Sequence, residues 1–356
     1  MNTFRILLTS DFLHRDGGLA YTEYDLSPLE DDPNIEIDIL PEGTRVLAEQ
    51  VEDIDVLIST PMSIAITSES FPASGRLALI ARNGAGYDDV DVDAATENGV
   101  AITVAKESVR RSVAVATLAL MFALVTRLID KHKLAVMGPE GWARRDGYAG
   151  VGLTGKTLGV IGMGNIGAEV FRLAVPLEMK YMACDPYADV ALAESLGVRL
   201  VDLDTLLREA DIVTIHCPLT DETRGLIDAQ RLALMKPTAY LINTARGALL
   251  DQTALAEALR SRRIAGAGLD VFVKEPPDAD DPILKLDNVV LSPHALNWTD
   301  ETGVLIGIEN VHAVLDVMHG REPHGILNRA VLENEAWRRK LAAYRDRFGA
   351  RDSRVG

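Results

Sequence analysis

Three side chains that could bind an anion and move a proton each follow an apolar stretch in the C-terminal half of the chain. Arg246 lies in LINTARGALLD, Glu275 in GLDVFVKEPP and His294 in LSPHALNW. A guanidinium can grip a carboxylate with two hydrogen bonds, and a histidine can give or take a proton near neutral pH. A carboxylate can in turn fix the tautomer of that histidine. These residue types predict chemistry at a carbonyl or hydroxyl group of a small anion.

Each of the three also has an ordinary structural interpretation. An arginine after a strand is commonly a surface residue, a glutamate before two prolines is commonly a loop charge, and a histidine after Ser-Pro can cap a helix. However, all three are expected at strand ends of one sheet. Because ligands of open α/β sheets bind beyond the carboxyl ends of the strands, this placement favours a shared site.

A glycine-rich motif predicts the cofactor of such a site. Gly162, Gly164 and Gly167 form the pattern G-x-G-x-x-G in GVIGMGNIG, after an apolar strand and before a helical stretch. In this context the glycines permit a tight turn and close approach of a pyrophosphate to helix N-terminal amides. The next strand ends in Asp185, which can bind the ribose hydroxyls and would repel a 2′-phosphate. NAD is therefore expected in preference to NADP, the alternative being a structural turn with a surface aspartate.

Two series of apolar stretches would position these residues. Alternation with polar or helical stretches predicts parallel strands joined by crossovers. The first series comprises 5–10, 35–40, 55–60, 77–84 and 100–105. After an apolar helix at 112–125, the second comprises 157–162, 181–185, 211–216, 239–245, 264–271 and 288–294. A helix at about 301–319 and the remaining residues are expected to pack on the first series.

A chain of 356 residues exceeds the size at which a single core keeps growing, so we expect two domains. Both are predicted to be Rossmann-like α/β domains with parallel sheets and a cleft between them. Residues 1–105, completed by 298–356, would form a flavodoxin-like substrate domain. Residues 106–297 would form a doubly wound NAD-binding domain.

Charge limits the partners of the protein. The net charge of −17 repels nucleic acid and anionic membranes, so neither is expected as a partner. A basic stretch near the C-terminus is interpreted as a solvated terminal helix and end; its cations are Arg338, Arg339, Lys340, Arg345, Arg347, Arg351 and Arg354.

Cysteine content and hydropathy favour a cytoplasmic location. Cys184 and Cys217 are too few for a disulfide framework and lack metal-ligand spacing, so no metal site is expected. The N-terminus lacks a signal-peptide layout. The apolar stretch 112–125 is shorter than the roughly 20 residues that span a bilayer, and reads as a buried helix.

The region from about Leu153 to Trp298 resembles the NAD-dependent D-isomer-specific 2-hydroxyacid dehydrogenases. The resemblance rests on LTGKTLGVIGMGNIG, ADIVTIHCPLTDETRGLID, LINTARGALLD, GAGLDVFVKEPP and LSPHA, in the order of the family. The N-terminal stretch RNGAGYDDVDVDAATENGVAITV also resembles the substrate-domain loop of the family and the strand after it. The resemblance implies hydride transfer between nicotinamide and C2 of a D-2-hydroxy acid or 2-oxo acid.

The resemblance also implies roles for individual residues. Arg246 would bind the substrate carboxylate and carbonyl oxygen, His294 would be the acid/base and Glu275 would fix its ring. The substrate-binding residues would be Asn83, Gly84, Ala85, Arg246, His294 and, in this chain, Trp298. The cofactor would meet Gly162, Gly164, Asn165, Ile166, Gly167, Asp185, Cys217, Pro218, Thr223, Thr244, Ala245, Arg246, Asp270 and His294.

Two features bear on substrate and assembly. In HALNWTDE, Trp298 stands where familiar members often have small residues, which puts glyoxylate or hydroxypyruvate as the natural substrate in doubt. Its indole could wall off the pocket, offer its N–H to a substrate or fill a seam. The segment around Trp142 resembles the arm with which relatives clasp a second subunit, so a homodimer through the NAD-binding domain is expected.

Other functions on the same fold remain open at this point. Formate enzymes are expected to carry glutamine where Glu275 stands, which weakens that alternative. Phosphite or other small-anion oxidation retains a similar trio of residues. A non-catalytic NAD(H)-sensing protein of the corepressor type would also keep the dinucleotide fold.

Overall fold

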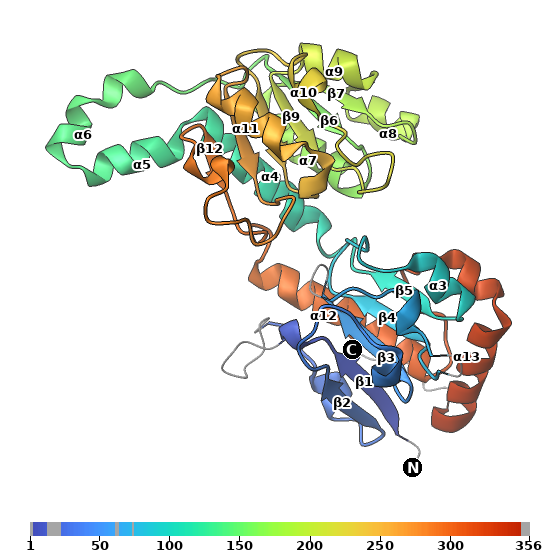
Figure 1. Ribbon diagram of the computed structural model, residues 1–356. Helices are drawn as coiled ribbons and strands as arrows, with labels where there is room; N and C mark the ends of the chain where they lie inside the picture. The colour runs from blue at the N-terminus through green and yellow to red at the C-terminus, as the bar shows by residue number, and fades with distance from the viewer. Residues whose placement is uncertain (1–2, 13–22, 61–63, 73–74, 350–356) are drawn as a thin grey trace. The chain divides into compact units, whose positions relative to one another are not determined.

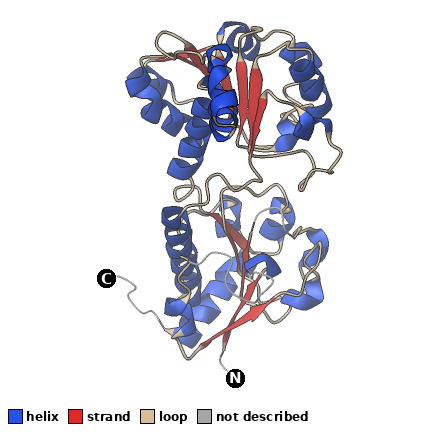
Figure 2. Ribbon diagram, turned by 90° about the vertical axis from the view of Figure 1, so that its left-hand side faces the viewer, coloured by secondary structure: helices blue, strands red, loops and turns tan. Residues whose placement is uncertain are grey.

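The computed structural model describes residues 3–12, 23–60, 64–72 and 75–349. The chain divides into two compact units, and each is described by itself. Unit 1 comprises Met1–Val109 and Trp298–Gly356, and unit 2 comprises Arg110–Asn297. In each unit a layer of strands lies between helices (Figure 2).

Unit 1 is built on a five-stranded sheet in the order β2-β1-β3-β4-β5 (Figure 1). All neighbouring strands are parallel. This is the flavodoxin-like strand order. The strands are β1 Phe4–Leu8, β2 Ile35–Ile39, β3 Val56–Ser59, β4 Leu79–Arg82 and β5 Ala101–Val104.

The helices of unit 1 come from both ends of the chain. They are α1 Ser27–Glu30, α2 Ala48–Val51, α3 Val92–Glu97, α12 Asp300–Met318 and α13 Glu335–Phe348. The C-terminal segment is held by buried contacts: Asn328 Oδ1 accepts from the Ile102 backbone N–H at 2.8 Å, and Tyr344 donates to Asp55 at 2.7 Å. These contacts make residues from the end of the chain part of the first unit.

The basic C-terminal helix is only partly solvated, so its interpretation as a solvated face needs correction. Lys340 of α13 donates to the backbone carbonyls of Leu77, Asn98 and Gly99 at 2.7, 2.9 and 3.1 Å. Burial lowers the pKa of Lys340 to about 8. This lysine therefore fastens α13 to unit 1. The predicted positions Arg351 and Arg354 lie outside the described residues.

Unit 2 is built on a seven-stranded parallel sheet in the order β12-β11-β10-β9-β6-β7-β8. This is the doubly wound order, which reverses between β6 and β9. The strands are β6 Thr157–Ile161, β7 Lys180–Cys184, β8 Val198–Leu200, β9 Ile212–Ile215, β10 Tyr240–Asn243, β11 Gly266–Leu269 and β12 Val289–Leu291. The predicted fold class, two α/β units with parallel sheets, is confirmed.

The sequence did not predict β8. This strand has three residues at the edge of the sheet, and two of them are exposed. A short edge strand needs few apolar residues, so it leaves no clear pattern in the sequence.

The helices of unit 2 are α4 Arg110–Val125, α5 Leu128–Val136, α6 Pro139–Ala143, α7 Asn165–Ala174, α8 Val190–Ser195, α9 Leu203–Glu209, α10 Ala229–Leu232 and α11 Gln252–Arg260. Four of them, α8, α9, α10 and α11, start at an N-cap whose carboxylate accepts a backbone N–H of the first turn: Asp189, Asp202, Asp228 and Asp251. The predicted apolar helix is α4, and eight of its residues are buried.

No single helix of the described residues is both long and apolar enough to cross a membrane. The bent pair α4 and α5, with 60° between them, meets the length and composition test when taken together.

Candidate active site

The glycine-rich turn between β6 and α7 has two glycines that close contacts require and a third that lies open. Gly162 has φ +89, and a Cβ on it would lie 2.5 Å from the backbone nitrogen of Cys217. A Cβ on Gly167 would lie 2.1 Å from the carbonyl oxygen of Gly162, so this glycine lets α7 approach the strand. A Cβ on Gly164 would meet nothing within 4 Å. The turn therefore leaves an open face at Gly164, which fits the close approach of a pyrophosphate.

Asp185 is anchored to this turn. Its Oδ2 accepts the backbone N–H of Met163 at 2.8 Å, and its Oδ1 accepts that of Tyr187 at 2.8 Å. Asn165 and Ile166 form the start of α7 and are half-buried. The carboxylate at the end of β7 and the helix start after β6 thus belong to one local structure.

The segment after β9 contains a neutral histidine and a neutral thiol. Burial lowers the pKa of His216 to about 3, and its Nε2 lies 3.0 Å from Thr214 Oγ1. Burial raises the pKa of Cys217 to about 11. Thr223 Oγ1 donates to the Pro218 carbonyl at 2.7 Å and so closes the following turn. Neither His216 nor Cys217 is suited to proton transfer near neutral pH.

Arg246 follows β10 on a turn that Asn243 holds in shape. The buried Asn243 accepts the backbone N–H of Ala245 at 3.0 Å and donates to the Arg246 carbonyl at 2.8 Å. Thr244 is fixed from the other side because its Oγ1 lies 2.9 Å from Thr117 Oγ1 of α4. The half-buried Arg246 donates from a terminal nitrogen to the Ala245 carbonyl at 2.8 Å.

Gly247 brings the Arg246 turn against the loop that carries Glu275. A Cβ on Gly247 would lie 1.9 Å from the backbone carbon of Phe272, a distance that no side chain could tolerate. The backbone N–H of Phe272 donates to Glu275 Oε1 at 2.8 Å. Gln252 of α11 accepts from Val273 N–H at 3.0 Å and supports the same loop. The arginine and the glutamate are therefore placed by contacts between two backbones.

Glu275 and His294 are hydrogen-bonded. Glu275 Oε2 lies 2.7 Å from His294 Nδ1, which leaves Nε2 on the opposite side of the ring. Burial raises the pKa of Glu275, but hydrogen bonds from His294 and Phe272 and the charges of His294 and Arg246 outweigh it and lower the pKa overall. The carboxylate is thus favoured in the folded state. The ionised Glu275 stabilises the folded protein at pH values above 4.5, the ordinary pKa of a glutamate. This stabilisation is lost as the pH falls through the lower pKa that Glu275 has in the folded state.

Asp270 fixes the turn that carries the histidine. This buried residue follows β11, and its Oδ1 accepts the backbone N–H groups of Ala295 and Leu296 at 3.2 and 3.3 Å. His294 itself has φ +53, a left-handed backbone conformation that residues other than glycine rarely adopt. A buried carboxylate therefore stabilises a strained backbone at the predicted acid/base.

The remaining predicted site residues lie in unit 1. Asn83 follows β4, is 6% exposed, and its side-chain nitrogen and oxygen have no hydrogen-bond partner among the described residues. The buried Arg82 shapes the loop by pairing with Asp89 and binding the Gly86 carbonyl at 3.3 Å. Gly84 accepts the Ala105 N–H at 2.9 Å. The side chain of Trp298 is 59% exposed.

Comparison with known proteins identifies the family. The sequence model of one protein family, described as the D-isomer specific 2-hydroxyacid dehydrogenase, NAD binding domain, matches residues 118–295. A glyoxylate reductase of Korarchaeum cryptofilum is 36% identical over 314 residues, which cover 87% of this chain and 94% of that enzyme. The chain belongs to the D-isomer specific 2-hydroxyacid dehydrogenase family.

Other relatives in this family have different substrates in their names. A D-3-phosphoglycerate dehydrogenase of Methanocaldococcus jannaschii is 39% identical; the match covers 79% of this chain but 53% of that enzyme. The structure of a D-lactate dehydrogenase of Aquifex aeolicus, solved with NAD and lactic acid, is similar to this one with a TM-score of 0.76 and 28% sequence identity. The match covers 88% of this chain and 96% of that chain.

This 2-hydroxyacid dehydrogenase is therefore an NAD-dependent oxidoreductase that acts on a small hydroxy or oxo acid. The family and these relatives do not favour the phosphite-oxidising or corepressor-like alternatives.

Sequence reasoning missed several supporting residues of the site. These residues act through contacts with the backbone, which no spacing pattern in the sequence predicts; they are Asn243, Gly247, Phe272 and Gln252.

Gly247→Ala tests the backbone contact that places Arg246 beside Glu275. The added methyl group cannot fit against Phe272, so the two loops must separate. We expect a loss of about 1–3 kcal/mol in stability and at least about a tenfold fall in kcat/KM for a 2-oxo acid. Thermal unfolding and steady-state kinetics measure both. Gly152→Ala is the matched control, because a Cβ there meets nothing within 4 Å. Equal activity of the two variants would contradict the contact's role.

Proposed function

We propose that the protein interconverts a 2-oxo acid and a D-2-hydroxy acid, with Arg246 as the anion-binding residue and His294 with Glu275 as the acid/base pair. The hydrogen bond of 2.7 Å between Glu275 and His294 carries the proposal. The charge of Arg246 acts on the same carboxyl group, so all three residues share one environment. His216, by contrast, is held neutral by burial.

The proposed mechanism assigns each residue one task. Bound NADH would supply a hydride to C2 of the 2-oxo acid, and NAD⁺ would accept it in reverse. Arg246 would bind the carboxylate and the carbonyl oxygen. His294 would donate the Nε2 proton to that oxygen as it gains negative charge, so the C=O group becomes CH–OH. Glu275 would hold the ring through Nδ1 and balance the charge of the imidazolium.

The fit of the cofactor rests on the local structure of unit 2. The open face at Gly164 and the first turn of α7, with Asn165 and Ile166, would meet the pyrophosphate. We propose that the dinucleotide also contacts Gly162, Gly167, Cys217, Pro218, Thr223, Thr244, Ala245, Arg246, Asp270 and His294. Asp270 already binds the turn after His294, so it would couple the cofactor to the acid/base.

Substrate recognition is proposed to involve unit 1 as well. Asn83 has a buried side-chain amide whose two polar atoms lack partners among the described residues, which supports a role in holding a ligand. The neighbouring Gly84 and Ala85 would offer backbone amides, and Trp298 would limit the size of the substrate. With Trp298 present, we do not propose glyoxylate or hydroxypyruvate as the natural substrate.

We also propose a homodimer. In unit 2, α5 and α6 form an arm that extends away from the sheet (Figure 1). This arm exposes large apolar side chains, including Leu128 at 56%, Val136 at 74% and Trp142 at 61%. Such side chains mark a protein interface. The net charge of −17 supports the proposal that nucleic acid and membranes are not partners, and the two cysteines support a cytoplasmic location.

Arg246→Ala tests the proposed anion-binding residue. Loss of two charge-assisted hydrogen bonds of about 1.5 kcal/mol each lowers kcat/KM by about a hundredfold, with higher KM and lower kcat. NADH oxidation at 340 nm with a panel of 2-oxo acids measures this, and NADH fluorescence should show retained cofactor binding. Arg260→Ala is the control, because its side chain is 72% exposed on α11. Kinetics of Arg246→Ala equal to those of the control would reject the role.

Asp185 provides a test of the preference for NAD. A carboxylate beside a 2′-phosphate repels it, so NADH should bind at least about tenfold more tightly than NADPH. Asp185→Ala should remove most of that difference, whereas Asp204→Ala on the exposed face of α9 should keep it. Fluorescence titration with both nucleotides measures the ratio. Tighter binding of NADPH by the unmodified protein would refute the assignment.

A further inference from the structure

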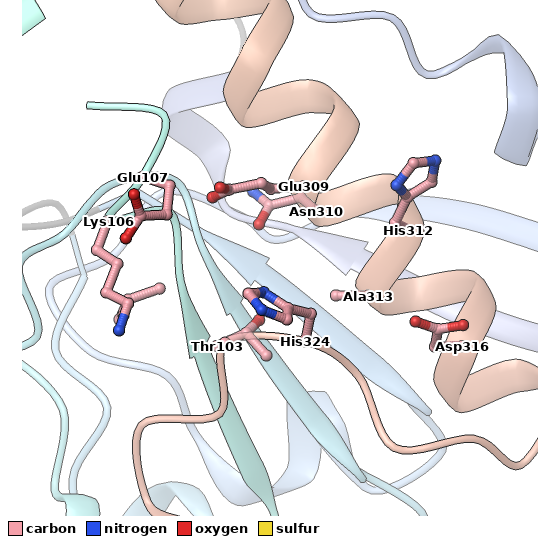
Figure 3. Close-up of a pocket in the computed structure, with 11 residues that line it drawn as sticks. Thr103, Lys106, Glu107, Glu309, Asn310, His312, Ala313, Asp316 and His324 are labelled. Carbon is pink, nitrogen blue, oxygen red and sulfur yellow. The ribbon is translucent and has the colours of Figure 1, made fainter. Parts of the chain in front are cut away.

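Two groups of polar side chains have no part in the proposed mechanism. One lies around a cavity of about 200 Å³ in unit 1, lined by the end of β5, by α12 and by the segment that follows α12 (Figure 3). Two acidic groups of this lining already have partners: Glu309 accepts a hydrogen bond from Ser108. Asp316 binds Arg321 Nε at 2.8 Å. Their charges therefore do not specify a ligand. The other group is a pair of buried hydroxyls in unit 2, beside the turn of Arg246.

Thr117 of α4 and Thr244, which follows β10, form this hydroxyl pair. Thr117 is 1% exposed and Thr244 is 9% exposed, and their Oγ1 atoms lie 2.9 Å apart. Thr117 Oγ1 also lies 2.9 Å from the carbonyl oxygen of Val113, one turn earlier in α4. Because a carbonyl oxygen can only accept, the single proton of the Thr117 hydroxyl is donated to Val113. Thr117 therefore accepts from Thr244, and Thr244 is the donor of the pair.

This direction decides what the Thr244 hydroxyl can offer to a ligand. Its proton is directed to Thr117, so it is not available to a second partner. A hydroxyl oxygen has two lone pairs, and within the described part of the chain no donor is bound to the Thr244 oxygen. Thr244 can thus accept a hydrogen bond from a ligand but cannot donate one.

Two contacts hold α4, and with it Thr117, in place on the sheet. In the first turn of α4, Arg111 Nε lies 2.9 Å from Oε1 of the buried Glu169 of α7. Farther along the helix, a Cβ on Gly268 of β11 would lie 3.0 Å from Leu120 Cβ, so glycine at this position suits the close approach of α4. The Thr117 oxygen is therefore a fixed acceptor for the Thr244 proton.

The strand order indicates which half of the dinucleotide Thr244 faces. The glycine turn follows β6, Asp185 follows β7, and β10 lies on the other side of β6 from β7. A dinucleotide bound across the point where the strand order reverses, with its adenosine half at Asp185, extends its nicotinamide half toward β9 and β10. Thr244 follows β10 and precedes Arg246 by two residues, so it belongs to the nicotinamide side.

The carboxamide of that half matches an oxygen that can only accept. Its nitrogen carries two N–H donors and accepts nothing, whereas a ribose hydroxyl can donate or accept and needs no partner of fixed direction. We infer that Thr117 is a positioning residue, which makes Thr244 an acceptor for a carboxamide N–H of the nicotinamide. The inference rests on the proposed cofactor contacts and adds the direction of one hydrogen bond. Holding the amide nitrogen would fix the rotation of the ring beside Arg246.

Isothermal titration calorimetry with three probes tests the inference. NADH carries the carboxamide, its reduced acetylpyridine analogue has a methyl group in place of the amide nitrogen, and ADP-ribose has no nicotinamide. The unmodified protein should bind NADH more tightly than the analogue. Thr117→Val leaves the Thr244 proton without its fixed acceptor, so it should lower this preference about fivefold, the effect of one hydrogen bond. Affinity for ADP-ribose should stay within about twofold, because that probe lacks the group that Thr244 binds.

Two further variants separate the hydroxyl from the packing of its side chain. Thr117→Ser keeps the hydroxyl and should restore the preference of the unmodified protein. Thr244→Val should lower the preference as much as Thr117→Val, and the double variant should lower it no further, because the two hydroxyls act as one unit. The double variant leaves neither hydroxyl without its partner, so it serves if Thr117→Val does not fold.

Thr126→Val is the matched control. Thr126 also donates to a carbonyl one turn earlier, that of Phe122 at 2.6 Å, but it is exposed, so the variant should keep the full preference. The inference is rejected if the unmodified protein binds NADH and the analogue equally, or if Thr117→Val keeps the preference. It is also rejected if Thr117→Ser fails to restore the preference, or if ADP-ribose binding weakens as much as NADH binding. A protein that shows the expected pattern but reduces no 2-oxo acid would reject the proposed reaction and support this inference.

Discussion

The candidate active site depends on the parallel pairing of β10, β11 and β12. Asn243 pairs with Leu269, and Leu269 pairs with Leu291, so the three strands end at the same edge of the sheet. The segments that carry Arg246, Glu275 and His294 all leave from this edge. Strand pairing alone brings these segments near one another. The approach of Gly247 to Phe272 then joins the loop after β10 to the loop after β11, and the hydrogen bond of Glu275 to His294 joins the loop after β11 to the loop after β12.

The electrostatics of these loops agree with proton transfer. Glu275 is favoured as a carboxylate because His294, the Phe272 amide and Arg246 together outweigh the cost of its burial. His216 and Cys217, which follow β9 beside the glycine turn, are neutral because they are buried. The unit therefore keeps the histidine and the thiol after β9 neutral, and places the hydrogen-bonded Glu275 and His294 on the side of β12.

Much of this arrangement could be predicted from the sequence, because its strands and its glycine turn have strong local signals. The apolar stretches located all five strands of unit 1 and six of the seven in unit 2. The missed strand, β8, is a short edge strand with little to bury.

The residues that support the site were harder to predict. Asn243 and Asp270 act by binding backbone amides, and the need for Gly247 arises from a segment 25 residues away. Lys340 was read as solvated because its three carbonyl partners are distant in sequence.

The pH dependence of Glu275→Gln most directly tests the claim that the glutamate and histidine act as one acid/base pair. The measurement is kcat/KM for reduction of the best 2-oxo acid, from pH 5 to 10, in the unmodified protein and the variant. An amide keeps a hydrogen bond to the ring but no longer balances its positive charge. We predict that the decline in activity at high pH moves to lower pH by about one unit. Superimposable pH profiles for the two proteins would contradict the account.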